Sequence, residues 1–247
     1  MERFGLGMLV STDYKFVFVH IPKTAGTSVT QILTSYCVTA PVTRLRRIAR
    51  KLGLKQNPSK AFFRSHDTAS QVLRSFGEDV FASYRIFSII RNPFDHAVSH
   101  YTYLREFPKA KVATFFSGVS FLEYLDFRLR STSMSRMPPF TRMKDQTSFV
   151  SDSNDQIIVP NLLHFENLAN DIPRLISALK LPAMSLPHAR RTKGRAGTLE
   201  KYYHSSEIEE KLRKLYARDF VNFGYPDDWR QGFAPKPQNS PLLGSNA

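Results

Sequence analysis

The chain has 247 residues, of which 42% are hydrophobic, which is enough for one sizeable core and favours a single domain. Its 35 Lys and Arg residues against 21 acidic ones give a formal net charge of +14, which favours polyanionic ligands or partners. Cys37 is the only cysteine, so an intrachain disulfide and a thiolate metal cluster are excluded. No run of about 18 apolar residues occurs, so we expect no signal peptide or membrane span, and a soluble, cytoplasmic chain.

The first predicted element is a β-strand that starts at Lys15 and stops before Pro22. It leads into KTAGTS (residues 23–28) and then a helix over residues 27–36, with Thr27 or Ser28 as its cap. Small residues let the backbone approach an anion, and the helix N-terminus presents N–H groups and positive charge. Because Lys23 precedes the only glycine of the segment, this is not the ATP-binding order G-x-x-x-x-G-K-[ST]. The segment therefore predicts a phosphate-binding turn of another kind.

A basic amphipathic helix is predicted over residues 43–55, with leucine and isoleucine on one face and arginines around the remainder. It is either a solvated helix or a surface that guides an acidic acceptor or touches a membrane peripherally. AFFRSH (residues 61–66) follows as a short strand or loop, and a helix over residues 69–76 ends at Gly77.

The second strong strand covers residues 84–90, and Pro93 starts a helix that runs to Phe107. Arg91 leaves the tip of this strand, and Ser99 lies about two helical turns further on. An arginine supplies a fork of donors suited to phosphate, and a serine adds a hydroxyl. Asp95 falls in the first helical turn, where a carboxylate is structurally favourable. Together with the first turn, this segment predicts a site for a ligand with two phosphate groups.

The rest of the chain continues the alternation of helices and strands. We expect a helix over residues 120–130, a long surface loop over 131–155, a strand over 157–165, a helix over 168–179, a basic loop over 188–197 and a last helix over 205–223. The alternation predicts an α/β fold with a mainly parallel sheet flanked by helices and ligands at the carboxyl ends of the strands. One domain is expected over residues 1–230, followed by a flexible tail over 231–247.

HIPKTAGTS (residues 20–28) followed by RNPFDHAVS (residues 91–99) resembles the two cofactor motifs of sulfotransferases that use 3′-phosphoadenosine 5′-phosphosulfate. The similarity is closest to carbohydrate sulfotransferases of the heparan/uronyl 2-O type and implies their fold, which is similar to that of P-loop kinases. It implies adenosine 3′,5′-bisphosphate as product. The resemblance implies that Arg91 and Ser99 bind the 3′-phosphate. It also implies that the 5′-phosphosulfate is bound by Lys23, Thr24, Ala25, Gly26, Thr27 and Ser28.

A late basic loop is the third element of the resemblance. Related enzymes close such a glycine-containing loop over the 3′-phosphate and adenine, which points to Lys193, Gly194 and Arg195. An ordinary solvated loop is the alternative.

Transfer of a sulfuryl group needs a cation on the departing oxygen and a base for the acceptor hydroxyl. Lys23 suits the first role. For the base we predict His66, since uronyl 2-O sulfotransferases resemble this stretch and carry a catalytic histidine there; Asp67 could orient it. Glu78 and Asp79 are the alternative bases. No metal is required.

The other histidines considered are not assigned a catalytic role. His96 and His100 are four residues apart on a helix, but no third ligand accompanies them, so no zinc site is expected. His20 and His164 are expected to pack or hydrogen-bond inside the protein.

Two other functions compete with sulfuryl transfer, namely an ATP-dependent phosphotransferase and a non-enzymatic polyanion-binding module. The predicted acceptor is a hydroxyl of a carbohydrate or glycolipid, and nucleic acid is not expected as a partner. Acceptor pockets are built from variable loops, so the sequence leaves the acceptor open, and the oligomeric state as well.

Overall fold

The computed structural model describes residues 8–38, 41–107, 110–130, 145–182 and 199–233. These residues divide into two compact units. The first unit holds the described residues of Met1–Ile90 and Thr147–Ala189. The second unit holds the described residues of Arg91–Gln146 and Arg190–Gln238. No helix within the described ranges is long and apolar enough to cross a membrane. The basic loop predicted over 188–197 and most of the tail predicted over 231–247 lie outside the described residues.

In the first unit, the described residues form one sheet in the order β1-β2-β3-β4. The strands are β1 (Leu9–Ser11), β2 (Phe16–Val19), β3 (Arg85–Ile90) and β4 (Asn161–His164). β2, β3 and β4 run parallel, with Val17 opposite Ile86 and Ser88 opposite Leu162. β1 pairs antiparallel with β2 and was not predicted. The α/β class with a mainly parallel sheet is confirmed.

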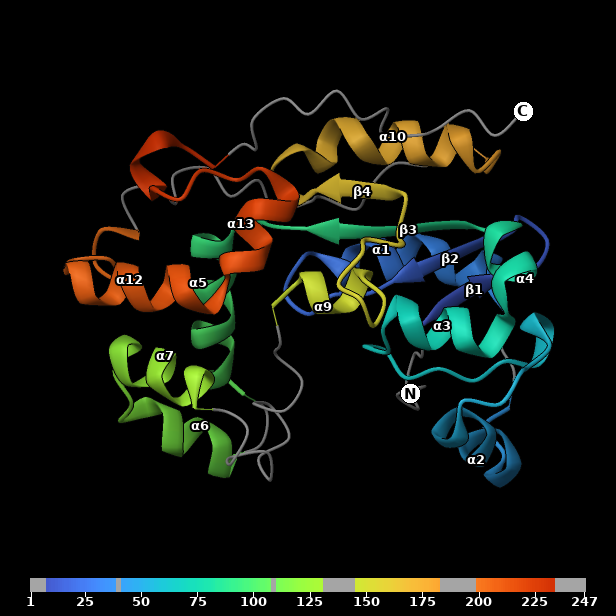
Figure 1. Cartoon of the computed structure of the whole chain (residues 1–247), viewed down its shortest axis with the longest axis horizontal. Coiled ribbons are helices and arrows are strands. Elements are labelled where there is room, and N and C mark those ends of the chain that lie inside the picture. Colours follow the sequence, from blue (N-terminus) through green and yellow to red (C-terminus); the bar gives the residue numbers. More distant parts are fainter. Residues whose placement is uncertain (1–7, 39–40, 108–109, 131–144, 183–198, 234–247) are drawn as a thin grey trace. The chain divides into compact units, whose positions relative to one another are not determined.

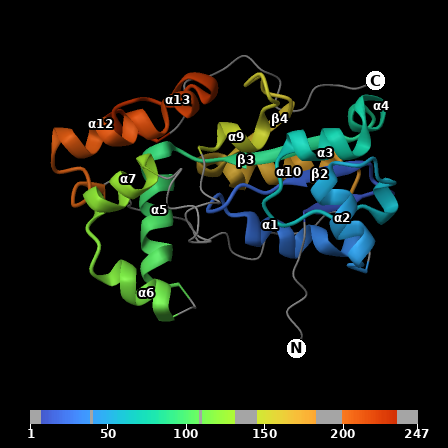
Figure 2. The ribbon, with the colours of Figure 1, turned by 60° about the horizontal axis from the view of Figure 1, so that its bottom comes forward.

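Helices cover both faces of this sheet (Figures 1 and 2). α1 and α10 pack on the face that carries Phe16, Phe18 and Phe87, where Leu33 and Ile172 complete a buried core. α3 lies on the opposite face from α1 (Figure 2). The helical elements of the unit are α1 (Gly26–Leu33), η1 (Thr34–Tyr36), α2 (Arg44–Leu52), η2 (Pro58–Lys60), α3 (Ala69–Phe76), α4 (Glu78–Ala82), α9 (Thr147–Val150), η3 (Phe165–Asn167) and α10 (Leu168–Ala178).

The prediction of a long loop over residues 131–155 is wrong for part of this segment. Residues 147–150 form α9, in which Phe149 and Val150 are buried, because two apolar residues inside this polar segment pack into the protein. The predicted strand over 157–165 is also too long. Only Asn161–His164 pairs with β3, and Ile157 forms an isolated bridge to Ser151.

The second unit is helical, and aromatic side chains fill its core. The helical elements are α5 (Pro93–Arg105), α6 (Ala110–Ser117), α7 (Phe121–Leu129), α12 (Ser206–Leu215), α13 (Ala217–Phe223) and η4 (Trp229–Gln231). Tyr101, Tyr124 and Tyr203 lie at the centre of the core. α6 was not predicted, and the helix predicted over 205–223 is interrupted at Tyr216, which is completely buried. Ser205 is the N-cap of α12, since its hydroxyl accepts the N–H of Ile208.

A buried polar network joins α5, α7 and α12. The Arg128 guanidinium donates to the hydroxyls of Tyr216 at 2.7 Å and Tyr124 at 3.0 Å. His96 Nδ1 lies 3.0 Å from the Tyr216 hydroxyl, and His100 Nδ1 lies 2.9 Å from that of Tyr124. Both histidines therefore take part in hydrogen bonds inside the second unit.

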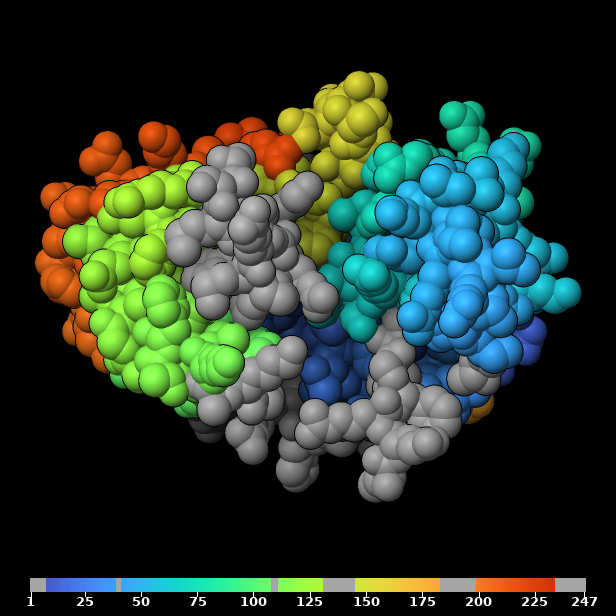
Figure 3. Space-filling model, turned by 90° about the horizontal axis from the view of Figure 1, so that it is seen from below, coloured from blue at the N-terminus to red at the C-terminus, as the bar shows by residue number. Residues whose placement is uncertain are grey.

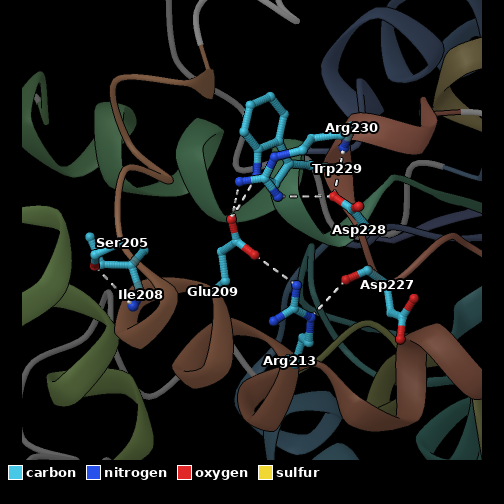
Figure 4. Close-up of polar contacts among 8 residues, drawn as sticks. All are labelled: Ser205, Ile208, Glu209, Arg213, Asp227, Asp228, Trp229 and Arg230. Atoms are coloured by element: carbon cyan, nitrogen blue, oxygen red, sulfur yellow. Dashed lines mark hydrogen bonds and ion pairs between the residues drawn. The ribbon is translucent and has the colours of Figure 1, made fainter.

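Glu209 of α12 binds the chain segment that ends the described residues (Figure 4). Its carboxylate accepts hydrogen bonds from the Trp229 indole at 3.1 Å and from Arg213 and Arg230 at 2.8 Å each. Burial alone would raise the pKa of Glu209, but these hydrogen bonds together lower it. A pocket of about 490 Å³ lies beside this cluster, lined by Tyr203 and Ser205 among others, and it contains none of the predicted site residues.

Candidate active site

The turn after β2 holds two residues in the left-handed backbone conformation. Lys23 has φ 68° and Ala25 has φ 67°, and neither is glycine. Such a conformation costs a non-glycine residue about 1–2 kcal/mol, and strain of this kind is concentrated at functional sites. Thr24 between them is fully buried, and its hydroxyl donates to the Ile21 carbonyl at 2.9 Å. The Thr24 side chain thus closes the turn, so a contact from Thr24 to a ligand would come from its backbone.

α1 begins at Gly26 without a side-chain cap. Ala25 is the N-cap, so the predicted capping by Thr27 or Ser28 is wrong, because both lie inside the first helical turn. The Ala25 carbonyl accepts the N–H of Ser28 at 3.1 Å, whereas the N–H groups of Gly26 and Thr27 make no backbone hydrogen bond to another described residue. A helix N-terminus with available N–H groups fits an anionic group such as a phosphate.

His20 packs directly over Gly26. A Cβ atom at Gly26 would lie 1.8 Å from His20 Nε2, so no other residue fits here unless the imidazole moves. The ring is also stacked on Phe18, with centroids 5.6 Å apart and an interplanar angle of 17°. The sequence predicted packing for His20, and the structure adds that the single glycine of the turn is required by this ring.

Gly26→Ala should lower the free energy of unfolding by about 2 kcal/mol. Overpacking against the His20 ring costs about 1–3 kcal/mol and outweighs the gain of up to about 1 kcal/mol from alanine in a helix. In a His20→Ala background the clash is absent, so the same change should be neutral or stabilising. Urea unfolding of the four proteins measures this coupling, and Ala25→Gly is the matched control. Additive effects would contradict the packing contact.

His66 lies beside His20 in the loop before α3. Its Nδ1 is 3.0 Å from the His20 carbonyl oxygen, and the two rings are 4.7 Å apart. Because a carbonyl only accepts, Nδ1 must carry the proton, and in the neutral ring Nε2 then has the lone pair. Burial, and secondarily the charge of His66, lowers the pKa of His20 to about 3, which makes His20 a poor base near neutrality. His66 is therefore the better candidate of the two.

The depressed pKa of His20 makes stability depend on pH. The pKa of His20 is about 3 in the folded protein and 6.5 in the unfolded chain, where burial and His66 no longer act on it. Between these two pH values only the unfolded chain carries the proton. The free energy of unfolding should fall by up to about 1.4 kcal/mol per unit as pH falls from 6.5 toward 3, with no contribution above 6.5. His20→Phe, measured by urea unfolding at several pH values, should show a shallower dependence. Parallel curves would show that His20 titrates alike in both states.

The carboxylates considered as alternatives lie elsewhere. Asp67 does not orient His66: it forms an ion pair with Arg50 of α2 and accepts the backbone N–H of Arg64 at 2.9 Å. Glu78 and Asp79 are exposed on α4, which precedes β3 and lies at the amino end of that strand (Figure 1). The turn of Lys23 follows the carboxyl end of the parallel strand β2. Glu78 and Asp79 therefore lie at the opposite end of the parallel strands from this turn.

In the second unit, Arg91 is the first residue after β3 and is buried. Its Nε and Nη2 lie 2.8 and 2.6 Å from Asp95 Oδ2, and its backbone N–H donates to the Gln146 side chain at 2.8 Å. Asn92 caps α5 through the N–H of Phe94 at 3.0 Å. Asp95 therefore positions Arg91, a role beyond the predicted charge effect at the helix N-terminus.

Ser99 and the late basic loop complete the predicted set. Ser99 is half-buried on α5, the helix that Pro93 starts as predicted. Lys193, Gly194 and Arg195 lie outside the described residues. Within the described ranges, no group of three or more His, Cys, Asp or Glu side chains is placed to hold a metal ion.

Comparison with models of protein families matches residues 7–226 to one described as "Sulfotransferase family". The chain belongs to this sulfotransferase family. The match includes both the turn of Lys23 and the segment of Arg91, so both motifs lie within the sulfotransferase region. Comparisons with curated proteins and with solved structures gave no match. As a sulfotransferase, the protein moves a sulfuryl group from a donor to an acceptor.

Proposed function

We propose that this sulfotransferase uses 3′-phosphoadenosine 5′-phosphosulfate as donor and a hydroxyl of a carbohydrate or glycolipid as acceptor. The main support is the turn after β2, which places Lys23 just before a helix N-terminus whose first N–H groups, at Gly26 and Thr27, are not used by other described backbone groups. These groups fit the 5′-phosphosulfate. Arg91 and Ser99 are assigned to the 3′-phosphate by the family motif.

Bound donor supplies the sulfuryl group, and the protein's residues supply charge and proton transfer. Lys23 would hold the 5′-phosphate side of the donor, where its ammonium would stabilise the negative charge that develops as the sulfuryl group leaves. His66 accepts the proton of the acceptor hydroxyl at Nε2 while the new sulfur–oxygen bond forms. The Nδ1–H bond to the His20 carbonyl holds the ring in the tautomer that this step needs. No residue in this scheme requires a metal ion.

The base is assigned to His66 on two observations. His20 is the nearest other histidine, but its pKa of about 3 opposes proton uptake near neutrality. Glu78 and Asp79 follow α3 and lie at the amino end of β3. The acceptor class rests on the family motif and on the net charge of +14, which suits an acidic glycan or a glycolipid with an acidic head group.

Calorimetric titration tests the donor. Adenosine 3′,5′-bisphosphate should bind without Mg²⁺, and ATP with Mg²⁺ should bind at least tenfold more weakly. Transfer from labelled donor to a panel of glycans and glycolipids, read as a mass increase, then identifies the acceptor. Tight ATP binding without bisphosphate binding would favour a phosphotransferase, and polyanion binding without any transfer would favour a binding module.

A further inference from the structure

α2 exposes an apolar stripe that no described residue covers. No residue of this helix is buried, and Leu45, Ile48 and Leu52 are 78%, 51% and 65% exposed. Val42 and Leu54 at its two ends are exposed as well, so five of the nine exposed large apolar side chains among the described residues fall within residues 42–54. Scattered exposed apolar residues are ordinary, but a cluster of this kind indicates an interaction surface.

The attachment of α2 turns this stripe outward. Leu45, Ile48 and Leu52 share one face by helical spacing, and Arg50 lies roughly 140–160° around the helix from each of them. Arg50 forms the ion pair with Asp67, and the N–H of Gln56 after the helix donates to the Ser75 carbonyl of α3 at 2.7 Å. The helix is thus held by its basic side. Figure 3, seen from below, shows its light-blue atoms at the surface of the first unit.

The surroundings of the stripe are strongly cationic. Residues 41–66 contain eight lysines and arginines and no acidic residue. Arg44 and Lys51 are exposed and lie at one border of the stripe, while Arg46 lies toward the other. An apolar face bordered by cations on a helix is the pattern that lies in the interface of an anionic membrane.

We propose that α2 docks the protein on the surface of an anionic phospholipid membrane. Leu45, Ile48 and Leu52 enter the boundary between head groups and acyl chains, and the bordering cations lie over lipid phosphates. A second copy of the chain is a poorer occupant, because it would bring the same cations face to face. A soluble acidic glycan would use the cations but gain nothing from the apolar side chains.

Docking has a consequence that rests on the proposed function. Asp67 joins α2 to the loop that carries His66, so a docked α2 holds the proposed base near the membrane surface. A glycolipid embedded in that surface is then the acceptor class that the geometry favours over a soluble glycan.

Sedimentation of the full chain with lipid vesicles tests the proposal. Vesicles with one third phosphatidylglycerol should bind the chain at least tenfold more tightly than pure phosphatidylcholine vesicles. The triple variant Leu45→Ser, Ile48→Ser, Leu52→Ser should lose at least tenfold in binding to the anionic vesicles, whereas Val221→Ser, at an equally exposed apolar residue of α13, should bind as the parent does. Circular dichroism should show both variants folded, because the stripe packs against no core.

A second measurement reports insertion directly. Leu52→Trp should be quenched by brominated acyl chains in anionic vesicles, while the parent, whose only tryptophan is the buried Trp229, should not. Equal vesicle binding by the triple serine variant would overturn the proposal in favour of adsorption by bulk charge. A dimer that the same variant dissociates, seen by analytical ultracentrifugation, would assign the stripe to a second copy. Lys23→Ala should bind vesicles normally, so loss of transfer and loss of docking are separable.

Discussion

Lys23→Ala should lower kcat for sulfuryl transfer about a thousandfold, or about 4 kcal/mol in the activation barrier. The ammonium is proposed to act on charge that develops in the transition state, so the ground state loses less. The affinity for adenosine 3′,5′-bisphosphate should fall no more than about tenfold. Single-turnover rates with labelled donor and calorimetry with the bisphosphate measure the two effects separately.

Lys15→Ala is a matched control for this variant. Lys15 is also a lysine in the left-handed conformation, with φ 50°, but it precedes β2 at the opposite end of the strand. Both substitutions place alanine in the same strained backbone, so their effects on stability should be similar. A Lys23→Ala enzyme that keeps transfer within threefold of Lys15→Ala would refute the leaving-group role.

His66→Gln should lower kcat about a hundredfold or more while donor affinity changes less than threefold, because a general base contributes to the chemical step. The wild-type profile of kcat/KM against pH should have an acidic limb that the variant lacks. A merely structural histidine would not change this profile. The measurement uses the acceptor found with the glycan and glycolipid panel.

His204→Gln controls for the removal of a histidine. His204 Nδ1 also contacts a backbone carbonyl, that of Lys201 at 3.2 Å, but it is exposed in the second unit. This variant should turn over as the parent does. Normal turnover by His66→Gln would reject base catalysis by a side chain of this loop. Glu78 and Asp79 would not replace His66 as the base, because they lie at the amino end of β3, opposite to the turn of Lys23.

Elements with strong local signals were predicted well. Apolar strands that end at a proline or an Arg-Asn-Pro turn have cues within a few residues, and Phe16–Val19, Arg85–Ile90 and α5 follow them. β1 was missed because three residues carry too little pattern, and its pairing depends on the neighbouring strand β2. α9 was missed because its burial comes from distant segments, and local polarity favoured a loop.

For the candidate site as well, the sequence predicted some features and missed others. Lys23, Arg91 and His66 were predicted from residue type, motif and family resemblance, and their roles stay predictions. The partners of these residues were not: Asp95 positions Arg91, Asp67 pairs with Arg50, and the His20 carbonyl faces His66. The last two join segments 17 and 46 residues apart, which no local spacing predicts.

The sequence by itself determined the α/β class, the sulfotransferase family and the two motif segments, because these depend on short patterns of residue type. Tertiary structure alone decided the surroundings of the candidate groups. It buried the His20 ring over Gly26, left Nε2 of His66 with the lone pair, and removed Glu78 and Asp79 to the other end of the strands. It also turned Leu45, Ile48 and Leu52 outward through the Arg50–Asp67 pair. Burial, tautomer and orientation are set by contacts between distant segments, and these exist only in the folded chain.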